Sequence, residues 1–158
     1  MFDAIALAKR LHGAEPGISL LIVGYAAQKK VQEAIKKEVF EYPFISAVGL
    51  DHLVSHRTIN EAIREADFGI ISYPRNISTW NSHPTKMFEY LGAQLPILLV
   101  DNPRWVSYCS PYSAAVIFTS NDSHADIALL IKSMRWRLSR KTKRAKWMVR
   151  TRPRLPPV

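Results

Sequence analysis

A lysine and a glutamate three residues apart, Lys86 and Glu89, are the pair whose types and spacing most directly suggest binding chemistry. On a helix, positions i and i+3 share a face, so both side chains can contact one ligand. An ammonium group suits a phosphate, and a carboxylate accepts hydrogen bonds from two neighbouring hydroxyls, as on a ribose. From the spacing alone, an ordinary surface ion pair explains these two residues at least as well as a ligand site does.

The polar loop that leads into this pair predicts an anion site. Asn81 or Ser82 can cap the helix that follows, and Pro84 suits its first turn. The open backbone N–H groups of a helix start attract phosphate, and the helix dipole strengthens that attraction. Because an acidic residue would stabilise the first turn better than Lys86 does, the lysine indicates a ligand. His83 lies beside this predicted site, either as a further donor or as an exposed loop residue.

The elements that must position these residues alternate between strands and helices. Apolar, β-branched runs predict strands, and amphipathic spacing predicts helices. The expected strands are 18–23, 44–48, 68–72, 96–100 and 115–118, and the expected helices are 2–11, 28–40, 58–66 and 84–93. This order predicts an α/β fold with a Rossmann-like open parallel sheet and helices on both faces. A doubly wound unit usually begins with a strand, so we expect the first strand of the sheet to be missing.

Ligands of such sheets bind beyond the carboxyl ends of the strands, where strand order reverses. The loops that begin at Gly24, Gly49, Ser72 and Asp101 are therefore the ones expected to surround a site.

The segment from Pro84 to Ile97, PTKMFEYLGAQLPI, resembles the Pro-x-Lys-x-(Phe)-Glu-Tyr-(small)-x-Gly-x-Pro signature of retaining glycosyltransferases of family 4. Residues 21–24, 48–49 and 66–74 resemble, in the same order, that family's second strand with its glycine, its next strand-to-loop turn and its Ala-Asp strand. The resemblance covers about residues 2 to 130. It implies the C-terminal, Rossmann-like half of a two-domain GT-B enzyme, which holds a nucleoside-diphosphate sugar.

The resemblance also implies roles for single residues. Glu89 would hold the donor ribose, Lys86 the diphosphate, and the loop after Gly49 would lie against the base. Ser72 and Thr85 would be second contacts. Many members have a second glutamate eight residues before the ribose-binding one, but this chain has Asn81 there, so no catalytic residue is assigned.

The resemblance further implies a retaining hexosyl transfer to a saccharide or lipid-linked acceptor, in cell-surface polysaccharide or glycolipid synthesis. The acceptor would be held by an N-terminal domain that we expect to be missing, and this chain alone is expected to be inactive. The nucleotide sugar is a substrate, and no cofactor is implied.

The positive charge of the chain is confined to its end. Residues 1–131 contain 11 Lys and Arg against 13 Asp and Glu, a net charge of −2, whereas residues 132–158 contain 11 Lys and Arg and no acid. We therefore predict a nucleotide-sugar-binding domain over 1–131 and a basic C-terminal helix with a disordered tail over 132–158. The tail has three open interpretations: a helix packed on the domain, contact with anionic membrane through 132–154, and nucleic-acid binding, the least favoured. The rival function is accordingly a noncatalytic basic binding module on a Rossmann-like core.

Other patterns restrict the function. No apolar run approaches the roughly 20 residues of a membrane span, and the N-terminus lacks the features of a secretory signal, so we expect a cytoplasmic protein. The tail leaves contact with the inner face of the membrane open. The lone Cys109 and the pair His52 and His56 do not form a metal motif. The sequence contains no Gly-x-Gly-x-x-Gly, Walker or Gly-x-Ser-x-Gly motif, which argues against NAD, ATP and serine-hydrolase chemistry.

Overall fold

The computed structural model describes residues 2–76, 80–119, 122–123, 126–127 and 129, together with the backbone of residues 145–150. Helices and strands alternate along most of this range. In chain order they are α1 (Phe2–Ala14), β1 (Ile18–Val23), α2 (Lys29–Glu41), β2 (Ile45–Val48), α3 (His56–Glu65), β3 (Phe68–Ile71), α5 (Thr85–Gly92), β4 (Ile97–Val100), α6 (Pro103–Cys109), the 3-10 helix η1 (Ser110–Tyr112), β5 (Ala115–Phe118) and β6 (Ala145–Arg150).

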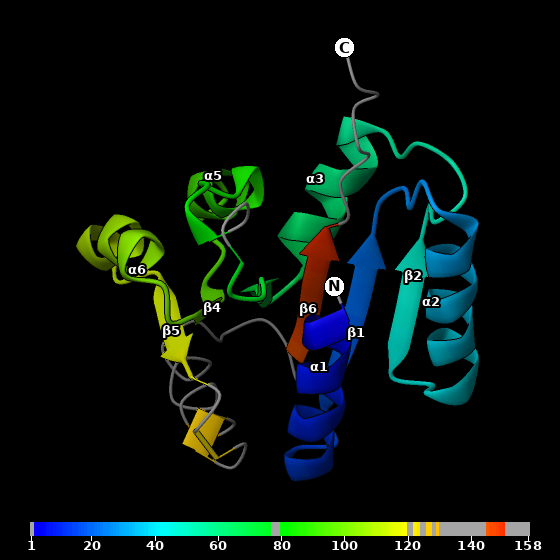
Figure 1. Cartoon of the computed structure of the whole chain (residues 1–158), viewed down its shortest axis with the longest axis horizontal. Coiled ribbons are helices and arrows are strands. Elements are labelled where there is room, and N and C mark those ends of the chain that lie inside the picture. Colours follow the sequence, from blue (N-terminus) through cyan, green and yellow to red (C-terminus); the bar gives the residue numbers. More distant parts are fainter. Residues whose placement is uncertain are drawn as a thin grey trace.

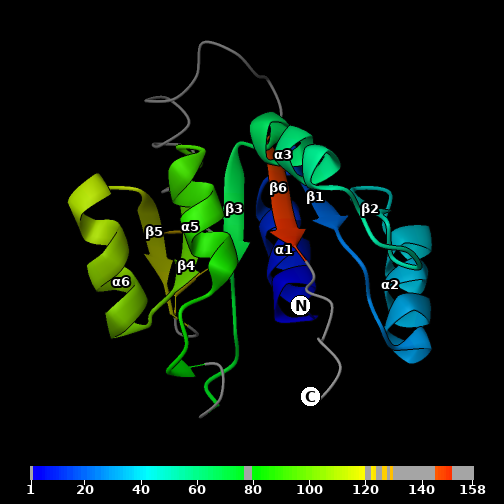
Figure 2. The ribbon, with the colours of Figure 1, turned by 90° about the horizontal axis from the view of Figure 1, so that it is seen from above.

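The strands form a parallel sheet in the order β2-β1-β6-β3-β4-β5 (Figures 1 and 2). The first two strands, β1 and β2, pair with each other, and the next three, β3, β4 and β5, form a second set. Strand β6 joins the two sets, because it pairs with both β1 and β3. Rossmann-like sheets have the order 3-2-1-4-5-6, in which the central position belongs to strand 1. In this protein β6 occupies that central position.

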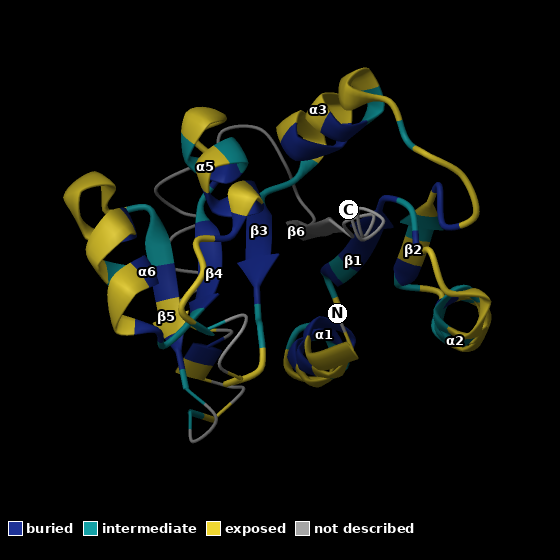
Figure 3. Ribbon diagram, turned by 45° about the horizontal axis from the view of Figure 1, so that its top comes forward, coloured by how far each residue is buried: buried dark blue, intermediate teal, exposed yellow. Residues whose placement is uncertain are grey.

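Helices cover both faces of the sheet (Figures 2 and 3). The helices α1 and α2 pack on one face, and α3, α5 and α6 pack on the other. Along β1, Leu20 and Ile22 belong to the core under α1, while Leu21 and Val23 belong to the core under α3 and α5. Because both of its faces are covered, a strand of almost uniformly apolar residues is stable in this interior position.

The predicted α/β class and Rossmann-like parallel sheet are confirmed, and β1 and β5 have the predicted bounds. Helix α3 begins two residues earlier than predicted, because Ser55 is its N-cap and the Ser55 hydroxyl accepts the Thr58 N–H at 3.1 Å. Helix α6 was not predicted.

The region 132–158 differs from its prediction where the structure describes it. The helix predicted for the first part of 132–158 lies outside the described residues, whereas residues 145–150 form strand β6, which was not predicted. The physical reason is that β1 and β3 present backbone hydrogen-bonding groups on both sides of one position, which a strand satisfies and a helix cannot. The sheet position of the strand that was predicted to be missing is held by β6. Residues 132–144 and 151–158, with their predicted disorder and membrane contact, lie outside the described residues.

Within the part of the chain that the structure describes, none of the helices combines the length and the apolar content needed to cross a bilayer.

Candidate functional site

Helix α5 packs closely against β3. Tyr90 is completely buried, and its ring lies on Gly69 of β3. A Cβ atom at Gly69 would overlap that ring, so only glycine lets the helix approach the strand this closely. Met87, also completely buried, fills the next turn of the same face. Because α5 follows β3 and packs back across it, its N-terminus lies at the carboxyl edge of the sheet.

The N-terminus of α5 has no side-chain cap. Its N-cap residue is Pro84, so the prediction that Asn81 or Ser82 caps this helix is wrong. The reason is that α6 holds the preceding segment elsewhere. The Asn102 amide donates to the Trp80 carbonyl at 2.9 Å, and the Trp105 indole donates to the Ser82 carbonyl at 2.8 Å.

A third and longer bond, from Arg104 Nη1 to the Asn81 carbonyl at 3.5 Å, extends this arrangement. The carbonyls of residues 80 to 82 thus all accept from α6, which positions the loop, while the Asn81 and Ser82 side chains stay exposed.

Lys86, predicted as the diphosphate contact, is buried at the first turn of α5, with 8% of its surface exposed. Its Nζ lies 4.7 Å from the centroid of the Tyr73 ring, directly after β3. A cation over an aromatic face gains about 0.5 to 2 kcal/mol. The structure therefore brings Lys86 to the carboxyl end of β3, where ligands of parallel sheets bind.

Glu89, predicted as the ribose contact, lies three residues further along α5 and is half-buried. Its Oε2 atom is inaccessible to solvent. A carboxylate on a helix that is fixed by Tyr90 has a defined position relative to Lys86. A defined position is what selective recognition of a ribose would need.

Gly24 and Gly49 end β1 and β2 with positive φ angles of 130° and 75°, which favour glycine, and their backbone turns the chain out of the sheet. Since neighbouring strands are about 4.8 Å apart, Gly24 lies about 10 Å and Gly49 about 14 Å across the sheet from the end of β3. The structure therefore does not bring Gly49 together with Lys86, although one extended ligand could reach both. After Gly49, a hydrogen bond from His52 lowers the pKa of the exposed Asp51.

The two predicted second contacts differ in their surroundings. Ser72 lines a cavity of about 300 Å³ at the ends of β3 and β4, together with Arg75, Asp101 and Asp3 of α1. Thr85 is exposed at the first position of α5. Both lie at the carboxyl edge, within one or two residues of the contact between Lys86 and Tyr73.

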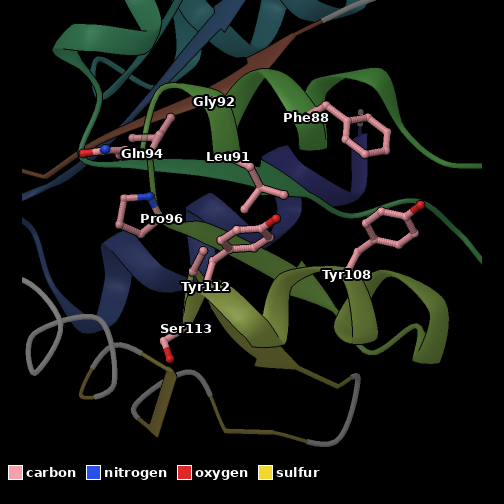
Figure 4. A pocket seen from close by; sticks show the side chains of 10 residues that line it. Phe88, Leu91, Gly92, Gln94, Pro96, Tyr108, Tyr112 and Ser113 are labelled. Carbon is pink, nitrogen blue, oxygen red and sulfur yellow. The ribbon is translucent and has the colours of Figure 1, made fainter.

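His83 belongs to an aromatic cluster with α6. Its ring centroid lies 4.9 Å from that of Tyr108 and 6.4 Å from that of Phe88. These two rings border an apolar groove of about 710 Å³ between α5 and α6, shown in Figure 4. The residues that line the groove are all uncharged and include none of the predicted site residues, so it offers no cation to a phosphate.

Sequence reasoning missed Tyr73, which faces Lys86, and the α6 residues that hold the loop before α5. A signal for α6 was present, because Asn102 followed by Pro103 is the N-cap and first-turn pattern of a helix start. For Tyr73 no local signal exists, since its role depends on the packing of α5 across β3.

No family model matches this sequence, and no match was found among curated proteins or solved structures. A functional assignment for this chain therefore depends on the geometry at the start of α5.

Proposed function

We propose that this chain binds a nucleoside-diphosphate sugar and serves as the donor domain of a retaining glycosyltransferase that acts on a saccharide or lipid-linked acceptor. The observation that carries the proposal is Lys86. Lys86 lies in the uncapped first turn of α5, beside Tyr73 at the carboxyl end of β3, where its positive charge and the open backbone N–H groups of the helix start attract an anionic ligand.

The chemistry of binding follows from the positions along α5. The diphosphate lies against Lys86 and the uncapped first turn, and the ribose hydroxyls donate to Glu89 one turn further. The base then extends across the carboxyl edge toward the turns at Gly24 and Gly49. The acceptor site, and any group that assists at the anomeric carbon, would come from another domain, in keeping with a role in polysaccharide or glycolipid synthesis.

Titration calorimetry with UDP-, GDP- and ADP-sugars tests this proposal, with Glu89→Gln as the first variant. Hydrogen bonds to a charged group contribute about 1.5 to 3 kcal/mol, so we expect binding at least tenfold weaker. The matched control is Glu33→Gln, which makes the same change at an exposed position of α2 on the opposite face of the sheet and should bind as the unaltered chain does.

Absence of binding to every nucleotide sugar would overturn the proposal, as would an equal loss in the two variants. If the chain instead bound anionic vesicles or nucleic acid and ignored nucleotide sugars, the alternative of a basic binding module would replace it.

A further inference from the structure

Tyr73 connects the first turn of α5 to the end of β3. It lies two residues after the last residue of β3 and is half-buried. Its ring centroid is 4.7 Å from the Nζ atom of Lys86. A cation within about 6 Å of a ring centroid is attracted by the negative face of the ring. The ring therefore restricts where the ammonium group of Lys86 can lie at the carboxyl edge of the sheet.

The Tyr73 ring is in turn held by Trp105 of α6. The two ring centroids are 5.9 Å apart and the ring planes are inclined at 67°, which is an edge-to-face arrangement. Trp105 is completely buried, its backbone N–H donates to Asn102 Oδ1, and its indole donates to the Ser82 carbonyl. Because burial and two hydrogen bonds fix Trp105, the surface against which Tyr73 packs has a defined position.

A lysine that is held in place before a ligand arrives binds an anion more tightly than a flexible lysine does. A flexible lysine side chain loses rotamer entropy on binding, and a side chain already held by a ring loses less. A ring also attracts the ammonium group without adding a negative charge, so the ring that holds Lys86 does not repel an anionic ligand.

A similar contact on the opposite face of the sheet provides a comparison. Lys9 of α1 lies over the ring of Tyr42, with 3.9 Å between its Nζ atom and the ring centroid. Lys9 also forms a salt bridge with Glu38 of α2, so this contact helps to join the two helices. Tyr42 is therefore a ring beneath a lysine in a structural setting, away from the proposed site.

We propose that Tyr73 is a positioning residue of the ligand site, whose ring holds the ammonium group of Lys86 where the diphosphate binds. The inference rests on the proposed function for the identity of the ligand. In this role Tyr73 acts through Lys86, and its ring matters whereas its hydroxyl does not. Phenylalanine should therefore replace Tyr73 in function, and an aliphatic residue should not.

The test uses the full chain and measures by calorimetry the binding of inorganic diphosphate, of UDP, GDP and ADP, and of the corresponding nucleosides. In Tyr73→Leu we expect about tenfold weaker binding of every diphosphate, and unchanged binding of any nucleoside that the unaltered chain binds. Tyr73→Phe retains the ring, and its affinity for diphosphates should stay within about twofold of that of the unaltered chain.

Tyr42→Leu is the matched control. It makes the same change beneath Lys9, and its diphosphate affinity should equal that of the unaltered chain. The double variant Tyr73→Leu with Lys86→Met should bind UDP, GDP and ADP no more weakly than Lys86→Met alone, because the ring acts through the lysine. Thermal unfolding of each variant checks the fold. If Tyr73→Leu unfolds, Tyr73→Met takes its place, because an unbranched side chain fills irregular space more readily.

The outcomes separate the role of Tyr73 from the identity of the ligand. Unchanged diphosphate binding in Tyr73→Leu beside a loss in Lys86→Met overturns the inference and leaves the proposed function standing. Equal losses in Tyr73→Phe and Tyr73→Leu overturn the inference, because they assign the effect to the hydroxyl. Equal losses in Tyr73→Leu and Tyr42→Leu overturn it as well, because they indicate a general loss of structure. Diphosphate binding that depends on the Tyr73 ring, without binding of any nucleotide sugar, supports the inference and overturns the proposed function. Failure to bind any diphosphate overturns both.

Discussion

Helices α5 and α6 lie on the same face of the sheet, yet they begin in opposite ways. At α6, Asn102 is 1% exposed and its Oδ1 accepts the N–H groups of Arg104 at 3.0 Å and Trp105 at 3.3 Å. At α5, the N-cap is Pro84, without a side-chain cap, and the first turn contains the buried cation Lys86. The start of α6 is thus stabilised by its own residues, whereas the start of α5 lacks both a cap and a favourable charge.

Under the proposed function, the difference is that between a helix that supports the site, α6, and a helix that binds the ligand, α5. The side chains that begin α6 also hold the loop before α5. These bonds fix where α5 begins, although the first turn of α5 has no cap of its own. Binding sites often retain such locally unfavourable features, and the cost is offset by the surrounding packing.

The largest effect should come from Asn102→Ala at the start of α6. The change removes the cap of two N–H groups and the donor to the Trp80 carbonyl, so we expect the free energy of unfolding to fall by about 2 kcal/mol. Urea unfolding measures this loss, and Asn60→Ala, at an exposed position of α3, is the control with a change below about 0.5 kcal/mol. Equal effects of the two variants would contradict the supporting role of α6.

A smaller effect, of opposite sign for stability and binding, should come from Thr85→Asp at the start of α5. An acidic first turn should raise the free energy of unfolding by about 0.3 to 1 kcal/mol, while repelling a diphosphate and weakening its binding severalfold. His56→Asp places the same residue at the first position of α3, which should produce the gain in stability without the loss of binding. If Thr85→Asp left diphosphate binding unchanged, α5 would not differ from the other helices in function.

The smallest effect should be a dependence on pH at the end of α6. Burial raises the pKa of the Cys109 thiol, so the folded state favours the neutral form. This contribution to stability is complete below the unfolded pKa of about 8.5 and is lost as pH rises through the higher folded pKa. The stability difference between the unaltered chain and Cys109→Ala should therefore shrink between neutral and alkaline pH in denaturant titrations. A difference that stays constant would mean that the end of α6 is hydrated rather than packed.

Local patterns were sufficient for most of the framework. The apolar run from Ile18 to Val23 predicted a strand covered on both faces, because side chains on both faces of such a strand are buried and are therefore mostly apolar. The spacing of Lys86 and Glu89 likewise predicted a shared helix. The cap of α5 was predicted wrongly, because the segment with Asn81 and Ser82 makes its hydrogen bonds to α6, more than twenty residues further along the chain.

By itself, then, the sequence determined the α/β class, the order of strands and helices, and the location of Lys86 and Glu89 on one helix. All three follow from periodicity within short segments. Only the tertiary structure decided that Tyr73 faces Lys86, that α6 holds the loop before α5, and that β6 occupies the centre of the sheet. These contacts join segments far apart in the chain, and their formation depends on which backbone groups and surfaces the assembled sheet leaves to be satisfied.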